Sequence, residues 1–240
     1  MRKTIHQQRH FPYQHPLFGK KTPSKNHDLW KNTIYYCWWS YLKRNESYIK
    51  TCNNNGRGAN AKLYKDFGDV RDDNFRNWWT RNNRGANLFA EPPISDTMRI
   101  VTKDEIKTLD NNVLLIRVPL DLPKRFLIKR LSNLLKKHHA GKRGQQNARR
   151  SQAKYQFRGQ PKINALHTAL LIYDKAKEFP EKKLWQLGEF LPQFKEIFKD
   201  YNNKGVTPDT VDKKIIEATV SRYKRKAAQS IKNVASGLFP

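Results

Sequence analysis

The sequence predicts a mainly α-helical protein with an aromatic-rich N-terminal helical module, a short β element and a C-terminal helical domain. Two observations favour this fold class. Apolar residues recur at helical spacing in the two outer parts, whereas one short central run is rich in β-branched residues. Hydrophobic residues make up 37% of the 240 residues, so we expect a folded core despite a formal net charge of +27.

Composition divides the chain into four parts. Residues 1–27 are rich in His, Gln, Lys and Pro without helical or strand periodicity, so we expect a flexible basic arm. Residues 28–93 form the aromatic helical module. Residues 94–158 contain the short β element, a basic helix and a basic loop, and residues 159–240 form the C-terminal helical domain.

The aromatic module contains five of the six tryptophans. Residues 34–48 predict a helix, residues 59–67 predict a second one, and Asp73 or Asn74 is a candidate N-cap for a third. Aromatic residues at helical spacing are most often core residues. Because one tryptophan of each adjacent pair is expected to be less buried, the alternative is a surface for a protein partner or for stacking on unpaired bases. The two pairs are Trp38 with Trp39 and Trp78 with Trp79.

The central part combines a strand pattern with a basic helix. Residues 113–118 predict a strand that ends at Pro119, because proline has no backbone N–H for a strand ladder. Residues 99–101 are a weaker candidate to pair with it. After Pro123, apolar residues at helical spacing predict an amphipathic helix with a buried apolar face. Residues 140–160 contain three glycines and many Gln and Arg residues, so we expect an exposed basic loop.

The most informative feature for function is the charge of residues 124–158, which contain twelve Lys or Arg residues and no Asp or Glu. A solvated surface usually mixes both signs of charge, whereas a run of one sign needs a counter-charged partner. The commonest such partner is a nucleic-acid backbone, because each neutralised phosphate releases counterions. The alternatives are a solvated surface and a ribosome-like or membrane-facing polybasic patch. The predicted phosphate contacts are Lys124, Arg125, Lys129, Arg130, Lys142, Arg143, Arg149 and Arg150.

The C-terminal domain has helical patterns over residues 163–177, 183–191 and 210–234. Their order is similar to a helix-turn-helix, in which the last helix presents polar and basic side chains to base edges in the major groove. The gap before the last helix is longer than in that motif, and a plain helical bundle with a basic stripe is the alternative. The predicted base contacts are Ser221, Arg222, Lys224 and Arg225.

Residues 66–73 gather four carboxylates, as a metal-dependent nuclease would require. Acidic caps and turns explain them more simply, and Cys37 and Cys52 have no Cys or His neighbour at metal-ligand spacing. We therefore assign no catalytic residue, cofactor or metal ligand. The two cysteines favour a reducing, cytoplasmic setting, and no run approaches the roughly eighteen apolar residues of a membrane span.

The sequence also contains five distinctive blocks: YYCWWSYLKRNESY at residues 35–48, YKDFGDVR at 64–71 followed by Trp78-Trp79, LFAEP at 88–92, VPLDLPKR at 118–125, and GLFP at 237–240. Together they resemble an uncharacterised bacterial protein family associated with mobile elements. The resemblance covers most of the chain after residue 28 and implies a bacterial, cytoplasmic setting. No activity is established for that family, so the resemblance assigns no functional residue.

From these observations we expect a non-enzymatic DNA-binding protein, such as a regulator or accessory factor of a mobile element. The first alternative is an RNA-binding subunit of a ribonucleoprotein assembly, and the second is a metal-dependent nuclease. We expect DNA rather than RNA as the partner, no membrane contact, and a candidate surface for a protein partner on the aromatic module.

Overall fold

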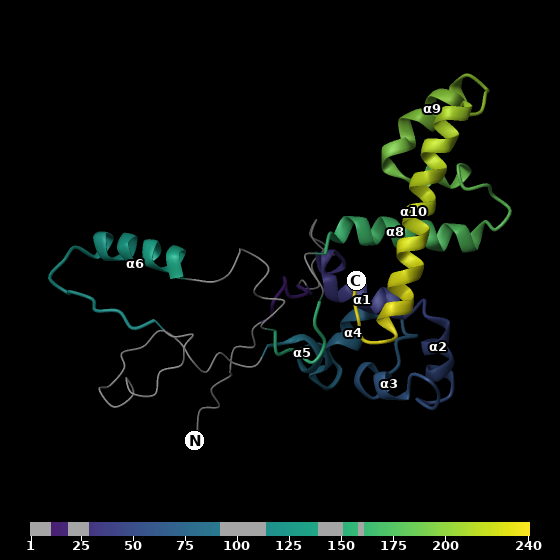
Figure 1. Cartoon of the computed structure of the whole chain (residues 1–240). Coiled ribbons are helices and arrows are strands. Elements are labelled where there is room, and N and C mark those ends of the chain that lie inside the picture. The colour runs from purple at the N-terminus through teal and green to yellow at the C-terminus, as the bar shows by residue number, and fades with distance from the viewer. Residues whose placement is uncertain (1–10, 19–28, 92–113, 139–150, 158–160) are drawn as a thin grey trace. The chain divides into compact units, whose positions relative to one another are not determined.

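A computed structural model describes residues 11–18, 29–91, 114–138, 151–157 and 161–240 (Figure 1). These residues are mainly α-helical, which confirms the mainly α part of the predicted fold class. The chain divides into two compact units, one formed by Met1–Pro92 with Asn147–Pro240 and the other by Pro93–Gln146. The aromatic module and the C-terminal helices therefore belong to one unit.

The helix predicted over residues 34–48 is two helices in the structure. It breaks after Leu42 because Asn45 caps a new helix, with its side-chain oxygen accepting a hydrogen bond from the Tyr48 N–H at 2.8 Å. The elements of this part are η1 (Leu29–Asn32), α1 (Ile34–Leu42), α2 (Glu46–Asn53), α3 (Ala61–Phe67), α4 (Phe75–Thr80), η2 (Arg81–Asn83) and α5 (Arg84–Phe89).

The other two predicted helices of the aromatic module are confirmed as α3 and α4. The side chain of Asn74 accepts a hydrogen bond from the Asn77 N–H at 3.0 Å, so Asn74 is the N-cap of α4. Asp73, the other candidate cap, instead forms an ion pair with Lys43 of the α1–α2 connection.

The C-terminal part is built on two helices, α8 (Ile163–Glu178) and α10 (Thr210–Val234), which pack against each other and against α1. Asp209 begins α10 by accepting a hydrogen bond from the Asp212 N–H at 2.8 Å. The helix predicted over residues 183–191 is the 3-10 helix η4 (Gln186–Phe190), which is followed by η5 (Pro192–Phe194) and α9 (Lys195–Asn203). Figure 1 shows α10 running from α9 past α8 to the aromatic module.

Trp38 lies at the centre of the core, with none of its surface exposed. Its ring centroid lies 5.8 Å from that of Phe67, 5.3 Å from Phe89, 5.2 Å from Phe157 and 5.5 Å from Phe239. These neighbours come from α3, α5, residues 151–157 and the C-terminal end. The aromatic core therefore closes only when segments far apart in the sequence come together, which explains why the aromatic module is not a separate unit.

All four paired tryptophans are buried, so the expectation that one of each pair is less buried is wrong. Trp39 is 3% exposed and Trp79 is 5% exposed. Trp79 is covered partly by Phe11, whose ring centroid lies 5.9 Å away. These rings cannot stack on bases or form a partner surface without opening the core.

Residues 11–18 lie within the segment predicted to be a flexible arm, yet they pack on the aromatic core. Tyr13 and Phe18 are partly buried against it, and the Tyr13 N–H donates a hydrogen bond to the Tyr35 hydroxyl at 3.3 Å. The aromatic residues of this segment are therefore part of the core, and the segment is not a flexible tail.

The second unit contains α6 (Lys124–His138), and none of the helix is buried. Most of its apolar residues are exposed and the rest are half-buried; for example, Ile128 is 58% exposed and Leu135 is 42% exposed. The expected buried apolar face is therefore wrong for the described residues. Residues 114–118 form no strand, so the short β element is not confirmed there, and Val113 and residues 99–101 lie outside the described residues.

Gly85 of α5 provides a test of core packing. In an open helix, Gly→Ala stabilises by roughly 1 kcal/mol, but a Cβ at Gly85 would lie 2.2 Å from the Trp79 ring. We expect Gly85→Ala to lower the free energy of unfolding by about 1–3 kcal/mol in urea denaturation.

The control is Gly205→Ala, where the Cβ meets nothing within 4 Å and only the positive φ of +65° opposes the change. We expect a loss of about 1 kcal/mol there. A neutral or stabilising Gly85→Ala would contradict the described packing of Trp79.

Candidate nucleic-acid interface

The predicted phosphate contacts on α6 are all exposed. Lys124, Arg125, Lys129 and Arg130 form no ion pair with any residue that the structure describes, although the Arg130 guanidinium lies 5.4 Å from the Phe126 ring centroid. The other four predicted contacts, Lys142, Arg143, Arg149 and Arg150, lie outside the described residues.

Helical geometry arranges the charges of α6 in two stripes. Arg125, Lys129 and Lys136 recur at helical spacing along one stripe, and Arg130 and Lys137 lie on a neighbouring one. The leucines of the helix lie opposite the first stripe, and Lys124 falls among them. The basic side of α6 is therefore about 22 Å long for its fifteen residues and faces solvent.

The predicted base contacts on α10 are exposed as well. Val220, Tyr223 and Ala227 turn inward against the core, whereas Ser221, Arg222, Lys224 and Arg225 are exposed. None of the three cations has an ion pair among the described residues, and Arg222 lies over the Tyr223 ring at 5.7 Å. This part of the chain therefore presents a basic surface on a helix that α8 supports.

The predicted helix-turn-helix is not confirmed. In that motif, base-reading residues lie near the start of a helix that follows a tight turn. Here Ser221 and Arg225 lie in the middle of a 25-residue helix that also packs against both hydrophobic clusters of the unit. The second predicted helix is a 3-10 helix, and α9 separates it from α10. The α10 residues and the α6 residues belong to different units, so each set is a surface of its own.

The carboxylates of residues 66–73 each have a structural partner. Asp66 binds Lys154 Nζ at 2.5 Å and the Tyr155 hydroxyl at 2.7 Å. Asp69 accepts one hydrogen bond from Arg71 Nε that is shared between Oδ1 at 2.9 Å and Oδ2 at 3.0 Å, and Asp72 accepts one from the Asn74 N–H. Across the described ranges, no group of three or more His, Cys, Asp or Glu residues is placed to hold a metal ion.

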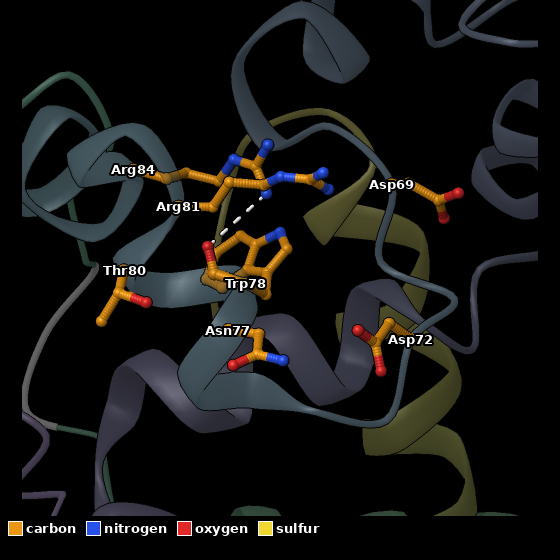
Figure 2. Close-up of a pocket in the computed structure, with 7 residues that line it drawn as sticks. All are labelled: Asp69, Asp72, Asn77, Trp78, Thr80, Arg81 and Arg84. Atoms are coloured by element: carbon orange, nitrogen blue, oxygen red, sulfur yellow. Dashed lines mark hydrogen bonds between the residues drawn. The ribbon is translucent and has the colours of Figure 1, made fainter.

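A pocket of about 420 Å³ on the first unit contains functional groups that the sequence did not predict (Figure 2). Its lining includes Trp78 and the side chains of Asp69, Asp72, Asn77, Thr80, Arg81 and Arg84. The only sequence signal for it is the Arg-Asn-Asn-Arg run at residues 81–84, one residue after the Trp78-Trp79 pair, and this run matches no recognised motif.

The two cysteines are buried in the first unit. Burial raises the pKa of the Cys37 thiol to about 12, and burial also raises the pKa of Cys52. Because the thiolate is the reactive form of cysteine, neither residue is suited to nucleophilic chemistry.

Comparison of the chain with protein-family models, curated proteins and solved structures found no match. Among the helices described, none is long and apolar enough to span a membrane. The candidate nucleic-acid interface is therefore described from the positions of its own residues alone.

Asp66 gives a pH-dependent test of how residues 151–157 are attached to α3. Burial raises the pKa of this carboxyl, but hydrogen bonds from Lys154 and Tyr155 outweigh it and the pKa falls below its ordinary value. A lowered pKa in the folded state means that its stabilisation is present above the unfolded-state pKa and is lost as pH falls through the folded-state pKa.

We therefore expect Asp66→Asn to cost about 1 kcal/mol near pH 7, because solvent screens the exposed Lys154. Near pH 3 the difference from wild type should shrink, as measured by urea denaturation. Asp200→Asn on α9 is the control, since Asp200 has no ion pair among the described residues. If the difference in free energy of unfolding between Asp66→Asn and wild type stayed constant with pH, the charge of Asp66 would not be what attaches residues 151–157 to α3.

Proposed function

We propose that the protein is a non-enzymatic DNA-binding protein. Within the basic run at residues 124–158, the proposed phosphate contacts are Lys124, Arg125, Lys129, Arg130, Lys142, Arg143, Arg149 and Arg150. One observation carries the proposal: this run has no acidic residue, and the cations of its described helix are exposed without carboxylate partners. Closely spaced cations of one sign repel each other, so a polyanion that neutralises them gains affinity.

The shape of α6 supports this proposal. An α-helix is about 10–12 Å wide with its side chains, and the major groove of DNA is about 12 Å wide. With Lys129 on one stripe and Arg130 on the next, α6 can reach phosphates on both sides of a groove or follow one strand. These contacts fix position and carry no base information.

We propose that α10 reads bases. The proposed contacts are Ser221, Arg222, Lys224 and Arg225. Arginine forms bidentate hydrogen bonds to guanine, and a helix held by α8 presents its arginines on a rigid support. A regulator or accessory factor of a mobile element is the role that we propose from the resemblance of the sequence blocks.

The phosphate proposal is tested by the salt dependence of duplex binding. We expect the double variant Lys129→Gln/Arg130→Gln to weaken binding to all sequences and to reduce the slope of log K against log salt by about 0.9 for each lost contact. Fluorescence anisotropy with a labelled duplex at several salt concentrations measures the slope.

The matched control is Lys195→Gln/Lys204→Gln, which removes the same charge from exposed positions in the first unit. An unchanged slope in the α6 variant, or an equal change in the control, would contradict the assignment to α6. Competition between duplex DNA and duplex RNA at one salt concentration tests the preferred nucleic acid, and tighter RNA binding would favour the ribonucleoprotein alternative.

The base-reading proposal predicts a different response for α10. After selection of a preferred duplex, Arg222→Gln/Arg225→Gln should reduce discrimination against single-base changes by about 1–3 kcal/mol for each lost bidentate contact. Lys232→Gln, an exposed cation further along α10, should lower affinity without changing discrimination. Equal discrimination by wild type and the double variant would remove base reading from α10.

A further inference from the structure

The pocket of the first unit contains two arginines without carboxylate partners. Arg81 is exposed, and Arg84 is partly buried with its guanidinium 5.7 Å from the Trp78 ring centroid. The hydrogen bond of Arg84, from Nη1 to the Trp78 carbonyl, is long at 3.5 Å. Within the described residues, neither arginine forms an ion pair. The pocket also contains two acidic residues, Asp69 and Asp72, which lie in the loop between α3 and α4.

Both arginines line the same pocket. Figure 2 shows them next to Trp78, with Asp69 and Asp72 to the right in the view. Burial lowers the pKa of Arg84, the positive charge of Arg81 lowers it further, and the negative charge of Asp69 opposes this shift. Two cations in this arrangement repel, and an anion between them would relieve the repulsion.

Among the described residues, the acidic residues of the pocket form no ion pair with Arg81 or Arg84. Asp69 forms its ion pair with Arg71, at 2.5 Å between Oδ2 and Nη2, and Asp72 accepts a hydrogen bond from the Asn74 N–H. Both carboxylates are therefore used in the loop that precedes α4.

The backbone next to these arginines has residues with positive φ angles. Asn82 and Asn83, between α4 and α5, both have left-handed φ angles, of +52° and +53°. Gly68 has a φ of +61°, and a Cβ there would lie 2.6 Å from Nη2 of Arg84. Consecutive left-handed residues other than glycine are uncommon, and such strain is often found at binding sites.

We propose that this pocket is a phosphate-binding site in which Arg81 and Arg84 hold the anion. Guanidinium groups match phosphate oxygens in bidentate geometry, and the side-chain amide of Asn77 supplies a further donor. The Thr80 hydroxyl is not such a donor because it donates to the Arg76 carbonyl at 2.9 Å. The volume of about 420 Å³ admits more than one phosphate group.

Two sources supply the same chemistry. One is a free phosphate or phosphomonoester, and the other is a phosphodiester of a nucleic-acid backbone, in which case the pocket would add a contact to the proposed function. The site itself does not depend on the basic residues of α6.

The test follows the Nε–H resonances of Arg81 and Arg84 by NMR during titration with inorganic phosphate at constant ionic strength, with chloride as the compensating anion. We expect saturable shifts of both resonances, and about tenfold weaker phosphate binding in Arg81→Gln, since one charge-assisted contact is lost. Arg57→Gln, which removes an exposed arginine outside the pocket, should bind phosphate like wild type.

Parallel titrations use a duplex with and without a 5′-phosphate. Shifts that need the terminal phosphate support a monoester site, and shifts with either duplex support a backbone contact. Absence of saturable shifts with inorganic phosphate and with both duplexes would overturn the proposal. Lys129→Gln/Arg130→Gln should leave phosphate binding unchanged, so failure of the α6 assignment and failure of the pocket are distinguishable. Arg81 is exposed, so its variant does not disturb the core.

Discussion

The packing of aromatic rings around Trp38 is the interaction on which the first unit depends. Trp38 brings α1 into contact with Phe67 of α3, with Phe157 and with Phe239 near the C-terminal end. The indole N–H groups of Trp38 and Trp39 are buried without a hydrogen-bond partner in the described structure, which costs roughly 1–3 kcal/mol each. Ring burial outweighs that cost, and it also fixes the base of the Arg81–Arg84 pocket, because Trp78 packs on Phe67.

The proposed binding surfaces lie outside this core and differ in how they are supported. α6 carries a dense set of cations on a helix with no buried residue, which suits loose, charge-driven contact with a polyanion. The arginines of α10 and of the pocket instead belong to a packed unit. Tyr223 anchors the part of α10 that carries the first set, and Gly68 and Trp78 lie against Arg84 in the pocket. A nucleic acid bound by the whole chain would combine the two kinds of contact.

Local sequence patterns predicted the parts of this structure that depend on local physics. The α10 helix was predictable because apolar spacing is local, and Asn74 was a predictable cap because an N-cap is local too. The burial of all four paired tryptophans was not predictable, because the covering residues, such as Phe11 and Phe157, lie far away in the sequence. Likewise, apolar spacing in α6 predicts a helix but cannot show whether anything covers its apolar face, and the Arg81–Arg84 pocket depends on left-handed residues that no pattern marks.

The central claim is that exposed basic residues of α6 hold a nucleic acid while the aromatic core remains unchanged. Hydrogen–deuterium exchange of the full chain, with and without saturating duplex DNA at low salt, tests this claim most directly. We expect slower exchange in α6 on addition of DNA, with unchanged exchange in α1 around Trp38. Unchanged exchange in α6 while DNA is bound, or exchange that changes only in α1, would contradict it.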